Sequence, residues 1–227
     1  MIDLNETLLS RNSPCIAAIA FGSKYAKGTI EEMRRIGCYV KETVLLGNSS
    51  SIEELIVDVL RSDLLYIVID SDEMTTRNLK IVERIISYSK ALAVGICIGE
   101  VSAKDTHKFE TLTKAFYFPA EDRIEKYIAF IANMIDKALQ PEALVRIDLS
   151  DLRMCLKGKT NRVWFGKAYG KEKGYDIANR FKKSDWYKNM LFYSCDAVLV
   201  ILAGDISLLD ANDTLVSISG ILTIPYH

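Results

Sequence analysis

Short, continuous apolar runs are the feature of this sequence that most restricts its fold. Residues 15–21, 64–70 and 91–99 are almost wholly apolar. Runs of this length, without alternating polar residues, are typical of strands buried on both faces, as in a parallel sheet. Amphipathic segments lie between the runs, and alternation of strand with helix predicts right-handed βαβ units.

The full pattern predicts an α/β fold with a Rossmann-like parallel sheet. Further strands are expected at residues 38–46 and 115–118. Helices are expected at residues 29–36, 52–62, 74–90 and 124–139. Thr29 and Glu32 have the spacing of a capping box, which supports a helix start at residue 29.

The sequence pattern of the last third of the chain differs from that of the first part and predicts a smaller α+β unit. Helices are expected at residues 151–157, 174–184 and 208–219, with strands at 162–170, 196–205 and 221–226. We therefore expect two domains, residues 1–145 and 146–227, joined by the long helix that ends near Leu139.

Composition and residue usage exclude several classes of protein. The apolar content of 49%, the charged content of 26% and the net charge of -1 are ordinary for a globular chain. No apolar run reaches the length of a membrane span, and the N-terminus has no signal-peptide pattern. The five cysteines and two histidines show no metal-ligand spacing, so we expect no metal, no disulfide framework and a cytoplasmic location.

The turn after the first predicted strand, residues 22–29, is the first place where a phosphate could bind. It contains Gly22 and Gly28, but Lys24, Tyr25 and Lys27 stand between them. Side chains there obstruct the close approach of an anion to consecutive backbone N–H groups. The two lysines could instead attract an anion as point charges, but a solvated surface loop is the interpretation we favour.

The turn after the strand at 64–70 is acidic and contains no glycine. Asp70, Asp72 and Glu73 precede the next helix, where carboxylates interact favourably with the helix dipole. Their charge is opposite to the one that binds phosphate. A divalent cation is the alternative occupant, but helix capping is the commoner role, and we expect no metal.

In the order of its elements the chain resembles the tubulin/FtsZ family. The strands at 62–70 and 91–99 resemble those flanking the tubulin signature, and residues 156–184 and 195–219 resemble the start of the C-terminal domain. Residues 146–151 are similar to the synergy loop, N-x-D-x-x-D, with Asp148 and Asp151 at its acids. The resemblance spans nearly the whole chain and implies a GTPase-type fold, with a truncated C-terminal domain, and a role in cell division.

Departures from the family pattern are concentrated at its nucleotide site. The signature G-G-G-T-G-[ST]-G would lie between Asp70 and Leu79, where this sequence has no glycine. The first loop has only a vestige of the phosphate-binding pattern, at Gly22, Lys24, Lys27 and Gly28. We therefore expect no GTP or other cofactor and a non-hydrolysing pseudo-GTPase.

In the resembled family, the synergy-loop acids act on the GTP of the next subunit in a filament. Asp148 and Asp151 would then be the catalytic pair, acting on a partner's nucleotide and aiming at one water. The alternative is that Asp148 caps the following helix and Asp151 lies in its first turn. The expected partner is an FtsZ-type filament or another copy of the chain, head to tail.

Two alternative functions stay open at this stage. The first is a nucleotide-binding GTPase with a non-standard site. The second is nucleic-acid binding, because residues 157–188 carry ten Lys or Arg and three acids. Aromatic residues are interleaved with these bases: Trp164, Phe165, Tyr169, Tyr175, Trp186 and Tyr187. Against it, aromatic residues in 162–170 could be required for the core. The sequence has too few histidines to favour an enzyme of the histidine-triad type.

Overall fold

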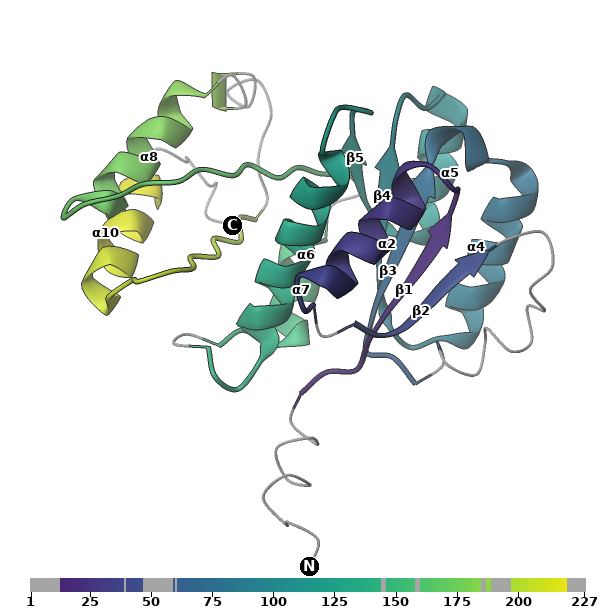
Figure 1. Cartoon of the computed structure of the whole chain (residues 1–227), viewed down its shortest axis with the longest axis horizontal. Helices are drawn as coiled ribbons and strands as arrows, with labels where there is room; N and C mark the ends of the chain where they lie inside the picture. The colour runs from purple at the N-terminus through teal and green to yellow at the C-terminus, as the bar shows by residue number, and fades with distance from the viewer. Residues whose placement is uncertain are drawn as a thin grey trace, which may run out of the picture. The chain divides into compact units, whose positions relative to one another are not determined.

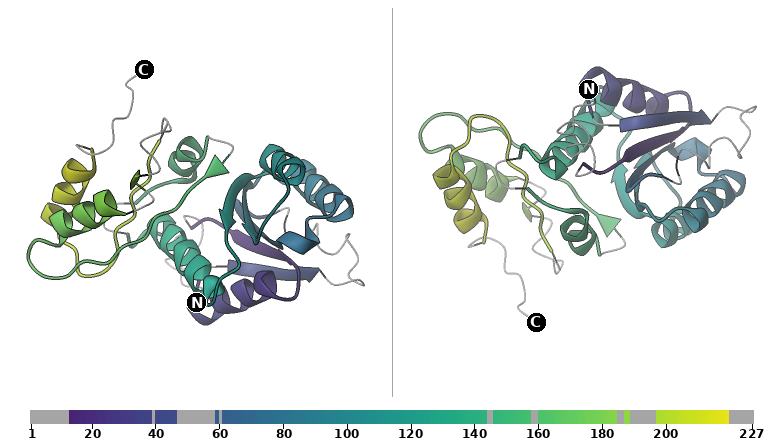
Figure 2. Two further views of the ribbon diagram at one scale, coloured as in Figure 1. Left: turned by 90° about the horizontal axis from the view of Figure 1, so that it is seen from above. Right: turned by 90° about the horizontal axis from the view of Figure 1, so that it is seen from below.

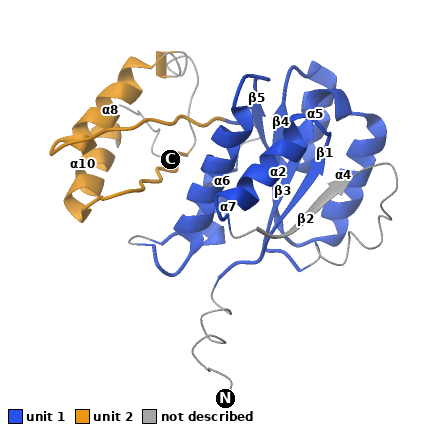
Figure 3. Cartoon of the chain, viewed as in Figure 1, with its two compact units in different colours: residues 1–161 blue, residues 162–227 orange. Residues whose placement is uncertain are grey.

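The computed structural model divides the chain into two compact units, Met1–Asn161 (unit 1) and Arg162–His227 (unit 2; Figure 3). It describes residues 13–38, 40–46, 59, 61–143, 146–157, 160–184, 187–188 and 197–219, with the backbone alone at 40–46, 160 and 219.

Unit 1 is built on a parallel sheet with strand order β2-β1-β3-β4-β5-β6. The strands are β1 (Ile16–Phe21), β2 (Val40–Leu46), β3 (Leu64–Asp70), β4 (Leu92–Ile98), β5 (Lys114–Phe118) and β6 (Thr160–Asn161). Every neighbouring pair is parallel. This confirms the expected α/β fold with a Rossmann-like parallel sheet.

Helices cover both faces of this sheet (Figures 1 and 2). The helices that the structure describes in unit 1 are α2 (Tyr25–Arg35), the short 3-10 helix η1 (Ser71–Glu73), α4 (Thr76–Tyr88), α5 (Ala103–Leu112), α6 (Ile124–Leu139) and α7 (Leu149–Cys155). Helices α2 and α6 lie on one face, and α4 and α5 lie on the other.

The strands bury both faces, and alternate residues point to opposite helix layers. Odd-numbered residues such as Ile19 and Ile67 join one core cluster with Val82 of α4 and Phe109 of α5. Even-numbered residues face the other layer, as Tyr66 shows by its bond to α6. This two-sided burial explains why the strand sequences are continuously apolar.

A buried polar contact joins the sheet to α6. The Tyr66 hydroxyl donates to Asp136 Oδ1 over 2.9 Å, and the two residues are 1% and 0% exposed. Burial, followed by the charge of Asp136, raises the pKa of the Tyr66 hydroxyl well above its usual value. The tyrosine is therefore protonated and acts as a donor to the carboxyl group.

Replacing Tyr66 by phenylalanine should lower the free energy of unfolding by about 1–3 kcal/mol, because a buried acceptor loses its donor while the ring volume is kept. Urea unfolding monitored by circular dichroism measures the difference. Tyr88→Phe is the matched control, since Tyr88 is 57% exposed and its loss of a hydroxyl should change little. Equal effects of the two substitutions would contradict the assignment.

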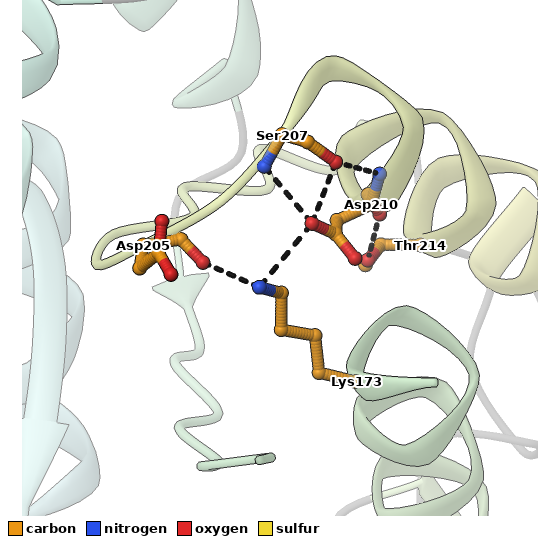
Figure 4. A network of polar contacts seen from close by, with 5 residues as sticks. All are labelled: Lys173, Asp205, Ser207, Asp210 and Thr214. Atoms are coloured by element: carbon orange, nitrogen blue, oxygen red, sulfur yellow. Dashed lines mark hydrogen bonds and ion pairs between the residues drawn. The ribbon is translucent and has the colours of Figure 1, made fainter. Parts of the chain in front are cut away.

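Unit 2 contains the two packed helices α8 (Lys173–Lys183) and α10 (Leu208–Ser219). Gly174 lies against α10 so closely that a Cβ there would meet the Asp210 carbonyl oxygen at 2.9 Å. A polar network holds the same contact (Figure 4): Lys173 Nζ donates to the Asp205 carbonyl oxygen over 2.5 Å and lies 3.3 Å from Asp210 Oδ2.

Several sequence-based boundaries differ from the structure. Helix α2 begins at Tyr25 rather than at residue 29, and the sequence pattern does not predict α5. Neither 162–170 nor 197–205 forms a regular strand. In the first of these segments, Trp164 instead packs on Phe181, with ring centroids 5.2 Å apart. Most of the predicted helix 52–62 and the predicted strand 221–226 lie outside the described residues.

The boundary between units also differs from the expected one at 145/146. Strand β6 pairs with β5, so residues as far as 161 belong to unit 1. Helix α6 is followed by α7 and β6 within the same unit, so it is not the direct link between the units.

Candidate functional site

The carboxyl edge of the sheet between β1 and β3 is the natural ligand position in this fold. Strand β1 has β2 on one side and β3 on the other, so the direction of winding reverses there. Doubly wound sheets bind ligands outside the carboxyl ends of the strands at this switch point. The turn that follows β1 and the last residue of β3, Asp70, both lie there.

The Asp70 carboxylate occupies the N-terminus of α2. Its Oδ1 accepts the N–H of Ala26 over 2.7 Å and that of Tyr25 over 3.2 Å. Its Oδ2 accepts the N–H of Lys24 over 3.2 Å and that of Tyr25 over 3.3 Å. These are the helix N–H groups that have no partner within a helix and that bind anions in phosphate loops. An internal carboxylate therefore takes the place that a phosphate would need.

Gly22 makes this contact sterically possible. A Cβ at residue 22 would lie 2.2 Å from Asp70 Oδ2, and the residue has a φ of 120°. Both facts require glycine. This glycine brings the turn onto the Asp70 carboxylate rather than onto an external anion.

The local charge is unfavourable for a phosphate. Burial raises the pKa of the Asp70 carboxyl, the N–H groups of Ala26, Lys24 and Tyr25 oppose that rise, and the charge of Asp72 adds to it. Asp72 and Glu73 follow in η1 with exposed side chains. A dianion entering here would meet the carboxyl groups of Asp70 and Asp72.

The four residues of the expected vestigial loop do not form one cradle. Lys24 precedes α2, and its Nζ lies 4.6 Å from the centre of the Tyr25 ring. Lys27 is within α2 and pairs with Glu31 at 3.7 Å. Gly28 is also in the helix, where a Cβ would lie 3.2 Å from Glu125 Cγ of α6. The loop that precedes α2 is thus shorter than the expected 22–29.

Asp148 and Asp151 form a reciprocal cap at the start of α7. Asp148 Oδ1 accepts the N–H of Ser150 over 2.7 Å and that of Asp151 over 2.9 Å. Asp151 Oδ2 accepts the Asp148 N–H over 3.0 Å. The arrangement is a capping box. Asp148 therefore caps the helix and Asp151 lies in its first turn, as the alternative interpretation expected. Action of the two acids on a partner's nucleotide stays a prediction.

The cap makes a pH-dependent contribution to the stability of α7. The Ser150 hydroxyl, then the Asp151 N–H, hold the pKa of the Asp148 carboxyl below its usual value. The contribution is therefore complete above the ordinary pKa of aspartate, about 4, and is lost as the pH falls through the lowered folded-state value.

Asp148→Ala should lower the melting temperature at neutral pH, because two helix N–H groups lose their acceptor, whereas Asp148→Asn should keep most of the cap. The difference between wild type and Asp148→Ala should shrink as the pH is lowered below about 4. Melting curves across this range measure it. A difference that does not change with pH would show that the carboxylate charge is irrelevant to the cap.

The role of Asp70 was missed by sequence reasoning, which assigned it to the start of the following helix. The signal was present, since 15–21 and 64–70 were both predicted as buried parallel strands. Neighbouring strands in such a sheet end at one edge, which would place Asp70 beside the turn at Gly22.

The described part of the chain offers little to other chemistries. It contains no group of three or more His, Cys, Asp or Glu that could hold a metal ion. Burial raises the pKa of the Cys38 and Cys97 thiols to about 12, so neither is a ready nucleophile. None of the helices among these residues has both the length and the apolar character needed to cross a bilayer.

Comparison of the chain with protein-family models, curated proteins and solved structures finds no match. The fold and the geometry of its carboxyl edge are therefore the observations from which a function has to be argued.

Proposed function

We propose that this protein is a tubulin/FtsZ-like pseudo-GTPase that binds no nucleotide at its sheet edge and acts by protein–protein interaction. The observation that carries the proposal is the Asp70 carboxylate, which accepts the N–H groups of Lys24, Tyr25 and Ala26. The positive end of α2 is already neutralised by the chain itself.

Nucleotide binding would require this carboxylate to leave. A phosphate needs the same N–H groups, and Asp70 is 3% exposed at the end of a central strand. The expelled carboxylate would remain next to the phosphate as a like charge, which is strongly unfavourable at short range. The same argument weighs against a GTPase with a non-standard site at this edge.

The interaction half of the proposal rests on the turn at Asp148 and Asp151. Ordering of both acids by the capping box holds two charges in a fixed place at the start of α7. We propose that this acidic turn docks on the nucleotide end of an FtsZ-type filament, or on another copy of the chain.

Thermal melting with and without GTP, GDP and Mg²⁺ tests the first half. A ligand that binds only the folded state raises the melting temperature by mass action. We expect no nucleotide-dependent shift for the wild-type protein. A shift that grows with GTP or GDP concentration would overturn the pseudo-GTPase assignment.

Co-sedimentation with an FtsZ-type filament, together with light scattering and GTP turnover, tests the second half. Asp148→Asn with Asp151→Asn keeps cap acceptors but removes both charges, and should weaken binding. Asp105→Asn, a first-turn acid of α5, is the matched control and should bind as wild type. Absence of co-sedimentation, of self-association and of any effect on assembly would sink the interaction role.

A further inference from the structure

The aromatic residues of unit 2 separate into a packed group and an exposed group. Trp164 packs on Phe181, and Phe181 packs on Tyr187 with ring centroids 5.4 Å apart. Tyr169 and Tyr175, by contrast, are 76% and 53% exposed. The expectation that aromatic residues in 162–170 serve the core therefore holds for Trp164 and fails for Tyr169.

Many cations lie close in sequence to the exposed tyrosines. The described residues of 162–188 include seven exposed cations and two exposed acids: Arg162, Lys167, Lys171, Arg180, Lys182, Lys183 and Lys188, with Glu172 and Asp176. Within the described part of the chain, Lys171, Arg180, Lys182 and Lys183 make no ion pair. Lys173 differs, since its ammonium group is held in the network with Asp210 (Figure 4).

Helix α8 presents one tyrosine and several cations on its solvent side. Gly174, Ala178 and Phe181 are its buried residues. Tyr175 and Lys182 are seven residues apart, so they lie on the same side of the helix, about two turns from each other. Lys183 is one residue further round the exposed side. Tyr169 and Lys171 come immediately before this helix.

We propose that unit 2 binds single-stranded nucleic acid through Tyr169 and Tyr175 and the cations of α8 and its leading turn. Exposed rings offer stacking surfaces for unpaired bases, and neighbouring Lys and Arg contact phosphates. A duplex keeps its bases stacked internally, so the rings favour a single strand.

This inference is independent of the proposed pseudo-GTPase role, because it rests on unit 2 and not on the sheet edge of unit 1. Fluorescence anisotropy of the full chain with a labelled oligo(dT) of about 20 nucleotides tests it. We expect binding at about 50 mM salt. The logarithm of the binding constant should fall linearly with the logarithm of the salt concentration. Duplex DNA of equal length should bind more weakly.

Two sets of variants separate stacking from charge. Tyr169→Ala and Tyr175→Ala should each weaken binding about tenfold, and the corresponding phenylalanine variants should restore it. Arg180→Gln with Lys182→Gln and Lys183→Gln should reduce the salt slope by roughly 2. The matched control is Arg77→Gln with Lys80→Gln and Arg84→Gln, which removes three cations from α4 of unit 1 and should leave both quantities unchanged.

Three outcomes would overturn the inference. The first is no binding of the oligonucleotide at low salt. The second is equal binding of poly-glutamate, with no response to loss of either tyrosine, which would indicate attraction to any polyanion. The third is salt-dependent self-association without oligonucleotide binding, which would assign this surface to a protein contact.

Discussion

Replacing Asp70 by alanine is expected to lower the free energy of unfolding by about 2–4 kcal/mol, because three backbone N–H groups at the start of α2 lose a common acceptor. The acceptor is 3% exposed, and its bond to Ala26 is 2.7 Å long. A buried donor left without a partner costs more than an average hydrogen bond contributes. Urea unfolding of the full chain measures the loss.

The same variant also tests what occupies the anion position. With the carboxylate gone, inorganic phosphate should raise the melting temperature of Asp70→Ala more than that of the wild type, because the helix N-terminus is then open to an anion. Glu83→Ala is the matched control, since it removes an exposed acid from the middle of α4. Wild-type stability in Asp70→Ala would contradict the capping role.

Substituting Gly22 by alanine should have the largest effect on unit 1, about 3–5 kcal/mol, because strained backbone and steric overlap act together. The φ of 120° disfavours any side chain, and the new Cβ would lie 2.2 Å from Asp70 Oδ2. The carboxylate would have to move, so the substitution also weakens the cap of α2.

Gly37 provides the control that separates these two causes. It has a φ of 76°, but a Cβ there would meet nothing within 4 Å. Gly37→Ala should therefore cost only about 1 kcal/mol, from the backbone alone. The effects of Gly22→Ala and Asp70→Ala should also be less than additive when combined, since both disrupt one contact. Equal costs at Gly22 and Gly37 would contradict the steric argument.

Much of unit 1 could be predicted because its signals are local. The strand at 64–70 and the helix at 124–139 were placed to the residue, since continuous burial and helical periodicity are both visible in a short window. The start of α2 was misplaced by four residues. Its capping group, Asp70, lies 44 to 46 residues away in sequence, so no local pattern marks it.

Unit 2 was harder to predict because some of its aromatic residues are packed and others are exposed. Trp164 and Tyr169 belong to the same β-rich run, yet the first packs on Phe181 and the second is exposed. Period-two spacing indicates a strand only when a neighbouring strand supplies backbone partners. Residues 162–169 have no regular strand structure, so the spacing alone misled.

The sequence by itself determined the alternation of strand and helix, the parallel sheet of unit 1 and the lack of a glycine-rich loop, because these depend on residue type and local spacing. Only the tertiary structure decided what fills the anion position, since it brings the ends of β1 and β3 to one edge and places Asp70 on the N-terminus of α2. It likewise decided which tyrosines of unit 2 meet solvent, because burial is a property of packed neighbours and not of the residue alone.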